Sequence, residues 1–124
     1  MVPENGSNEH IDQLIRSEAT VKALLNASNE SAFLYDNRGY ILSLNQAAAR
    51  RLNIEIEDAI GRHMSEIFPA DVARNRIKHM NKLVETGKPV RFQDIRDGHY
   101  FDISMFPILA QDGKVEMLAT FGYD

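Results

Sequence analysis

The chain has 124 residues and a mass of 14.1 kDa, and its 44% hydrophobic and 26% charged residues are typical of one globular domain. It contains no cysteine, which excludes disulfides, thiolate metal sites and cysteine nucleophiles, and its apolar runs are far shorter than the ~20 residues that span a bilayer. A net charge of −4 with dispersed basic residues argues against a nucleic-acid surface. We therefore expect a cytoplasmic domain without membrane or nucleic-acid contacts.

The N-terminal part predicts a polar leader followed by one helix. Residues 1–8 contain Pro, Gly, Ser and Asn with almost nothing to bury, so we expect a disordered leader there. Residues 9–26 carry apolar side chains at three- and four-residue steps, which predicts an amphipathic helix. Residues 27–124 would then form the folded domain.

A hairpin and three short helices are predicted next. Residues 31–36 and 40–44 are short apolar runs separated by Asn-Arg-Gly, a sequence typical of a hairpin turn. Asn45 stands where it can cap a helix over 46–52, and its amide can also bond the hairpin. Two brief helical segments follow, over 56–60 and 64–68.

The second half predicts one long helix and three strands. Residues 71–86 form an amphipathic pattern that ends at Gly-Lys-Pro. Strands are expected over 90–96, 100–109 and 114–123, and the two turns between them contain Asp-Gly. This order of elements indicates an α+β domain with an antiparallel sheet.

Several separated motifs, in order, resemble those of PAS sensor domains over about residues 27–124. They are Asp36-Asn37-Arg38-Gly39-Tyr40-Ile41, Asn45-Gln46-Ala47-Ala48, Ile60-Gly61-Arg62, Thr86-Gly87-Lys88-Pro89 and Asp112-Gly113-Lys114-Val115. The resemblance implies a five-stranded antiparallel sheet in the order 2-1-5-4-3, with short helices over one face and a cavity for a small ligand or cofactor. It also implies a sensory or dimerisation module of a larger signalling protein, such as a sensor histidine kinase or a transcription regulator, whose output domain would be a partner.

The expected interior suggests a set of candidate ligand-binding residues. Alternation along the strand over 100–109 puts one set of side chains on a single face, which the resemblance turns toward the cavity. A filled core without a ligand remains an alternative. The candidate residues are Met64, Arg76, Ile77, Met80, Phe101, Ile103, Met105, Leu118 and Thr120.

Arg76 is the anomaly in this set, because it lies within the apolar face of the long helix. A buried arginine requires an anionic partner. That partner would be a ligand carboxylate or phosphate, or else an acidic side chain such as Asp94 or Asp102. A third alternative is an arginine whose head group reaches solvent.

The sequence offers little support for metal, haem or catalytic chemistry. His10, His63, His79 and His99 have no metal-ligand spacing, so we expect no metal site. Haem-binding PAS domains use a helix histidine, and His79 lies on the equivalent helix, but its surroundings do not resemble those members. A cysteine-adduct flavin is excluded, and the cofactor, if there is one, is unknown. We find no catalytic motif and expect no enzyme activity.

The last strand is apolar on both faces, so its outer face needs a cover. Val115, Met117, Ala119, Phe121 and Tyr123 would lie on that outer face. The apolar stripe of the helix over 9–26 is the natural cover, and a second copy of the domain would extend it. We therefore predict a homodimer through residues 9–26 and the outer face of the sheet.

Overall fold

A computed structural model describes residues 19–20, 22–27 and 29–123 of the protein. Residues 22–27 are helical. The strands are β1 (Ser31–Asp36), β2 (Ile41–Leu44), β3 (Val90–Arg96), β4 (His99–Leu109) and β5 (Val115–Tyr123). The helices are α2 (Gln46–Leu52), α3 (Ile56–Ala59), α4 (Met64–Ile67) and α5 (Ala70–Thr86).

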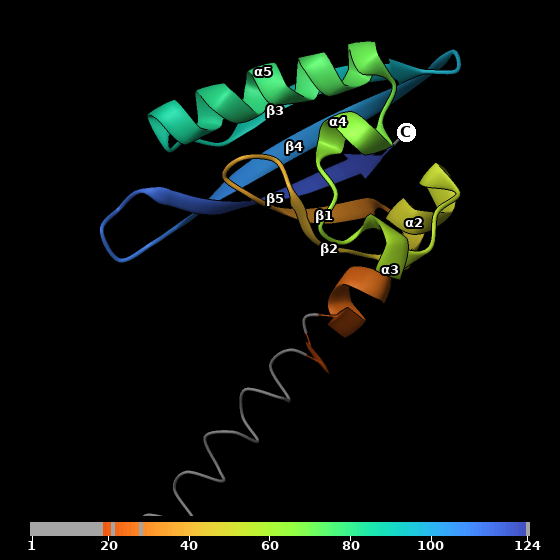
Figure 1. The fold of residues 1–124 in the computed structure, drawn as a ribbon, viewed down its shortest axis with the longest axis horizontal. Helices are drawn as coiled ribbons and strands as arrows, with labels where there is room; N and C mark the ends of the chain where they lie inside the picture. Colours follow the sequence, from red (N-terminus) through yellow and green to blue (C-terminus); the bar gives the residue numbers. More distant parts are fainter. Residues whose placement is uncertain (1–18, 21, 28, 124) are drawn as a thin grey trace, which may run out of the picture.

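The five strands form one antiparallel sheet in the order β2-β1-β5-β4-β3, which confirms the α+β class and the strand order expected from the resemblance. Figure 1 shows β1 beside β5 although more than 70 residues separate them in the chain. The first and last strands are therefore neighbours at the centre of the sheet, so the two ends of the domain lie close together.

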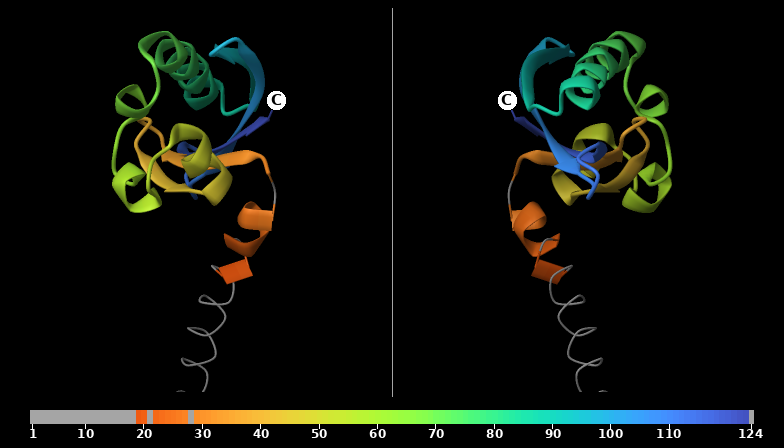
Figure 2. Two further views of the ribbon diagram at one scale, coloured as in Figure 1. Left: turned by 90° about the vertical axis from the view of Figure 1, so that its right-hand side faces the viewer. Right: turned by 90° about the vertical axis from the view of Figure 1, so that its left-hand side faces the viewer.

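The helices α2 to α5 lie together on one side of the curved sheet (Figure 2), with α5 against β3 and α2 against β1. The core fills the space between these two layers. Its fully buried members include Tyr35 of β1, Leu83 of α5 and Leu118 of β5. Burial of such side chains stabilises a fold by roughly 1.5–3 kcal/mol each.

The turn between β1 and β2 follows its sequence signature. The Asp36 carboxylate accepts hydrogen bonds from the backbone N–H groups of Arg38 and Tyr40, at 2.9 and 3.0 Å. Gly39 has a φ of +92°, and a Cβ there would lie 2.9 Å from the Nε2 atom of His63. Glycine is thus required both by the backbone conformation and by the close approach of the helix layer.

Asn45 joins α2, β1 and the segment that precedes β1. Its Oδ1 atom accepts from the backbone N–H of Ala48, which confirms the predicted cap, and from that of Ala32, both at 3.0 Å. Its Nδ2 donates to the backbone carbonyls of Leu25 and Glu30, at 2.7 and 2.9 Å. One buried amide therefore satisfies four backbone groups, and fixes where the N-terminal segment meets the domain.

The described part of the N-terminal helix projects away from the sheet and its helices (Figures 1 and 2). Leu24 is 69% exposed there, and Phe106 on the outer face of the sheet is 44% exposed. The expectation that this helix covers the outer face is therefore wrong for residues 22–26 within a single chain. The leader over 1–8 and the predicted helix over 9–18 lie outside the described residues.

Val115 also departs from the sequence-based expectation. Strict alternation placed it on the outer face, whereas it is buried in the core. The reason is a shift in the β4–β5 register, where Ile108 pairs with Met117 but Leu109 pairs with Val115. Glu116 is an extra residue in β5. Val115, which precedes it, therefore faces the opposite side of the sheet from the one that strict alternation predicts.

Candidate functional site

The structure brings the nine sequence-predicted candidate residues into the interior between the sheet and the helices. Met64, Met80, Ile103, Met105 and Leu118 belong to the buried core cluster. Ile77 and Phe101 are partly buried against it, while Arg76 and Thr120 are buried among it. These residues therefore share one location, and whether they hold a ligand stays a prediction.

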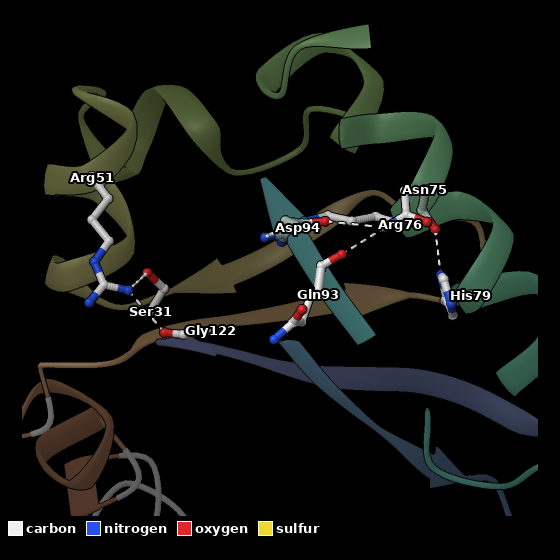
Figure 3. Close-up of polar contacts among 8 residues, drawn as sticks. All are labelled: Ser31, Arg51, Asn75, Arg76, His79, Gln93, Asp94 and Gly122. Atoms are coloured by element: carbon white, nitrogen blue, oxygen red, sulfur yellow. Dashed lines mark hydrogen bonds and ion pairs between the residues drawn. The ribbon is translucent and has the colours of Figure 1, made fainter. Parts of the chain in front are cut away.

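Arg76 forms a buried ion pair with Asp94 of β3 (Figure 3). Its Nε donates to the Asp94 Oδ2 atom at 2.7 Å, and its Nη2 lies 2.6 Å from the same oxygen. The side chains are only 3% and 0% exposed. Arg76 also stacks over Phe68, with its Cζ atom 4.2 Å from the ring centroid. The acidic side chain offered by the sequence, Asp94, thus neutralises Arg76 within the chain.

Tyr35 lies beside this ion pair with its hydroxyl fully buried. Burial raises the pKa of Tyr35 from its ordinary value of 10.0 to about 12, and the positive charge of Arg76 opposes that rise. Among the described residues, no group makes a hydrogen bond of good geometry with the hydroxyl. The tyrosine is therefore held neutral over the whole physiological range of pH.

A small cavity opens beside the ion pair and has a volume of about 10 Å³, which is room for one water-sized group. Three guanidinium groups border it, one each from α2, α5 and the end of β3. Thr120 of β5 lies in its wall, and the Thr120 hydroxyl is buried without a hydrogen-bond partner in the described part of the chain. The lining residues are Ser31, Phe33, Ala48, Arg51, Leu52, Arg76, Arg96, Thr120 and Gly122.

Arg96 separates this cavity from the outside of the domain. Its guanidinium stacks over Phe101, with Cζ 4.3 Å from the ring centroid, and lies 5.7 Å from the ring of Phe68. Its Nε is buried and has no hydrogen-bond partner among the described residues. Burial, followed by the nearby charge of Arg76, lowers the pKa of Arg96. The residue is thus a cation in an environment that disfavours its charge.

Arg51 of α2 holds three backbone or side-chain oxygens at the rim of the cavity. Its Nη1 donates to the Ser31 hydroxyl at 2.7 Å and to the Gly122 carbonyl at 2.9 Å (Figure 3). Its Nη2 donates to the Asn29 carbonyl at 2.9 Å. The side chain therefore joins the segment before β1 to the end of β5.

Sequence reasoning missed Arg51 and Arg96 as members of the site. A signal was present for Arg51, because it lies three residues after the buried Ala48 and so on the same helix face. Arg96 gave no such signal, since it stands at the end of a strand beside a turn. Its position depends on the pairing of β3 with β4, which brings Phe101 opposite Asp94.

His63 and His79 serve local structure. His63 caps α4, where its Nδ1 accepts from the backbone N–H of Ser65 and Glu66 bonds back to the His63 N–H. His79 stacks on Phe92 with ring centroids 4.0 Å apart, and its Nδ1 lies 2.8 Å from the Asn75 carbonyl oxygen. No three His, Asp or Glu side chains of the described residues are placed to hold a metal ion.

Comparison with known proteins identifies the class of domain. The family model described as the PAS fold matches residues 25–124, and the chain belongs to this family. No curated protein matches it in sequence. No helix within the described ranges has the length and apolar character needed to cross a membrane.

Solved structures with the same fold include domains of several signalling proteins. A domain of an HTR-like protein from Haloarcula marismortui is 23% identical, with a TM-score of 0.70, covering 78% of this chain and 98% of that one. A sensory box sensor histidine kinase from Vibrio cholerae is 18% identical, with a TM-score of 0.70, covering 93% and 96%.

The Vibrio cholerae protein VqmA, a LuxR-type receptor, is 26% identical with a TM-score of 0.71. The match covers 82% of this chain and half of VqmA. Another structure of VqmA, with the same identity and score, has DPO bound and is covered over 54% of its length.

Proposed function

We propose that this chain is a sensory PAS domain of a larger signal-transduction protein, with a sensor histidine kinase as the proposed parent. The observation that carries the proposal is that one side chain at the edge of the interior cavity, Arg51, is hydrogen-bonded to both ends of the domain. The similar fold of the Vibrio cholerae sensor histidine kinase supports the signalling role. The domain itself would act in the cytoplasm and without catalysis.

The proposed mechanism follows from the hydrogen bonds that Arg51 and Asn45 make with the two ends of the domain. Arg51 bonds Asn29 and Ser31 before and within β1, and Gly122 near the end of β5. Asn45 bonds Leu25 in the N-terminal helix. A ligand that moves Arg51 or α2 would change how the entering and leaving segments are held. It would shift the population of two arrangements of the chain ends, which is how an interior event reaches an output domain.

The test is native mass spectrometry of the purified protein, with an ultraviolet–visible spectrum of the same sample. A mass above that of the polypeptide, or absorbance from a chromophore, supports a ligand sensor and identifies what it binds. A bare polypeptide mass with a featureless spectrum, together with no change on adding a cell metabolite extract, counts against sensing by this domain.

A second candidate is a ligand-free dimerisation module. The observation that favours it is the interior cavity of only about 10 Å³, which leaves the core nearly filled. Such a module would be a constitutive dimer whose interior residues serve packing alone. A transcription regulator as the parent is a further alternative, which the likeness to VqmA favours; the net charge of −4 still argues against DNA contact by this domain itself.

Both candidates include a homodimer through residues 9–26 and the outer face of the sheet. On that face Phe106 and Phe121 form an edge-to-face pair with ring centroids 6.1 Å apart. Cross-strand neighbours extend this patch, since Leu34 pairs with Ala119 and Ala119 with Phe106. An apolar sheet face next to an amphipathic helix is the kind of surface that a second copy would cover.

A further inference from the structure

The cavity is bordered by Arg51, Arg76 and Arg96, and within the described residues only Arg76 has a carboxylate at ion-pair distance, while Asp94 and Asp97 favour the charge of Arg96 without such a contact. Asp94 pairs with Arg76 and is fully buried by that contact. Neither Arg51 nor Arg96 makes an ion pair with any residue that the structure describes. Two guanidinium groups, one exposed and one half-buried, thus border one small space without a carboxylate at ion-pair distance, so an anion placed between them would be attracted by both charges.

Two buried donors at the same place have no acceptor. The Arg96 Nε and the Thr120 hydroxyl are both inaccessible to solvent and unpartnered within the described residues. Thr120 is 1% exposed and lies in the cavity wall together with Arg96. A buried donor left without an acceptor costs roughly 1–3 kcal/mol, so an acceptor atom in this cavity would be strongly favoured.

A larger cleft lies on the surface on the other side of Arg51 and Arg96. This cleft has a volume of about 290 Å³ and shares Arg51 and Arg96 with the cavity. Phe101 gives it an apolar wall, and Asp97 and His99 also line it, so the two arginines share the cleft with one acidic side chain. Movement of the Arg96 side chain would join the two spaces. The inner part admits one oxygen-sized group and the outer part an organic body.

We propose that a small organic carboxylate binds between Arg51 and Arg96, with one carboxylate oxygen reaching the cavity beside Thr120. Guanidinium groups match the planar, two-oxygen geometry of a carboxylate, and Phe101 provides a surface for the apolar body. A planar carboxylate needs less room than a tetrahedral phosphate beside a cavity that admits a single oxygen. This inference rests on the proposed sensory function and assigns its ligand class.

The proposed site is connected to both ends of the domain through the hydrogen bonds of Arg51. Arg51 uses its two terminal nitrogens to hold Asn29, Ser31 and Gly122. A carboxylate that draws Arg51 toward the cleft competes with these three acceptors. Binding would therefore loosen the contact between the segment before β1 and the end of β5, so ligand recognition and signal transmission use the same side chain.

The test is a nuclear magnetic resonance titration of the ¹⁵N-labelled chain with benzoate and acetate, each compared with its uncharged amide. We expect saturable shifts around Arg96 and Thr120 with the carboxylates and none with benzamide or acetamide. Arg96→Gln should weaken binding at least about tenfold, equivalent to about 1.4 kcal/mol. The isosteric Thr120→Val keeps the packing and should weaken binding by a smaller factor.

Arg91→Gln is the matched control, because Arg91 lies on the same strand but contacts the Tyr123 hydroxyl at 3.3 Å instead of the cavity. This variant should bind the two carboxylates with the same affinity as the unsubstituted chain. Equal shifts with carboxylates and amides, no saturable shift with either carboxylate, or an unchanged affinity in Arg96→Gln would each overturn the proposal. If these results came with a neutral molecule seen by native mass spectrometry, the sensory function would stand and the carboxylate assignment would be wrong.

Discussion

At the scale of single residues, the Arg76–Asp94 pair makes the fold sensitive to one carboxylate. Asp94→Asn would leave the Arg76 charge buried without its partner, because the aromatic ring of Phe68 cannot replace a carboxylate. We expect the free energy of unfolding in urea to fall by about 3–5 kcal/mol. The double variant Arg76→Met with Asp94→Leu should recover much of that loss, since it removes both charges.

The control for this prediction is Asp102→Asn on the neighbouring strand. Asp102 accepts a hydrogen bond from Gln93 at 3.2 Å in a partly exposed position. Its replacement should change stability by no more than about 0.5 kcal/mol. Equal losses from the two substitutions would show that the buried pair has no special role.

We predict that the folded chain loses stability at high pH because of the buried Tyr35 hydroxyl. Its pKa is raised from 10.0 to about 12 in the folded chain, so the folded state holds its proton more tightly than the unfolded state does. The stabilisation is complete below pH 10 and is lost as the pH rises from 10 toward 12. The free energy of unfolding that is lost between pH 8 and pH 11 for this reason is about 1.4 kcal/mol. Urea unfolding at pH 8 and pH 11 should show this difference in the parent chain.

Tyr35→Phe should remove that part of the pH dependence while changing stability at pH 8 little, because the hydroxyl makes no hydrogen bond of good geometry with the described residues. Tyr40→Phe, at an exposed tyrosine, should behave like the parent chain at both pH values. If Tyr35→Phe loses as much stability at pH 11 as the parent does, the buried hydroxyl is not the cause.

At the scale of elements, Asn45 is expected to control the junction of α2, β1 and the N-terminal segment. Asn45→Ala removes an acceptor for two N–H groups and a donor for two carbonyls. We expect a loss of about 2–4 kcal/mol, from the helix cap and the unsatisfied backbone groups together. Faster hydrogen exchange at the Ala32 and Ala48 amides would locate the effect.

Asn45→Asp separates the two halves of this interaction. It keeps the acceptor for Ala32 and Ala48 but cannot donate to Leu25 and Glu30. The cap should survive, with exchange at Ala48 close to that of the parent, while the N-terminal segment is released. Loss of protection at Ala48 in this variant would contradict the assigned roles.

The elements that the sequence predicted are those fixed by local chemistry. The Asp36 turn, the Asn45 cap and the positive φ of Gly39 depend on neighbours within a few residues, and each follows a known preference. The strand order came from the family resemblance. The facing of Val115 was wrong because one inserted residue in the β4–β5 pairing reverses the alternation, and no local pattern marks it.

Part of the candidate site could likewise be predicted from the sequence, and part of it could not. Arg76 was recognisable as a charged residue on an apolar helix face, and Asp94 was among its expected partners. The contacts of Arg51 with Gly122 span 71 residues, and the stacking of Arg96 on Phe101 depends on the strand register. Helical spacing placed Arg51 next to a buried face of α2 but could not show its partners, and Arg96 acquires its environment only when β3 pairs with β4.

At the scale of the whole molecule, the dimer prediction depends on two separate surfaces. Deleting residues 1–24 removes most of the helix predicted over 9–26 but keeps the Leu25 carbonyl and the Asn26 side chain that bond Asn45 and Gln46. The sheet should therefore stay folded while the dimer dissociates. Light scattering and circular dichroism measure the two effects independently. A dimer that survives the deletion would show that the helix is not part of the interface.

Phe106→Lys tests the second surface. Placed on the outer face beside Phe121, a lysine charge would be buried against the partner copy, so the dimer should weaken by at least tenfold, about 1.4 kcal/mol. Ile60→Lys is the matched control, because Ile60 is similarly exposed at 47% but lies at the end of α3 on the helix side. If both substitutions weaken the dimer equally, the outer face of the sheet is not the interface; if only Phe106→Lys does, the apolar patch on β4 and β5 is the surface that the second copy covers.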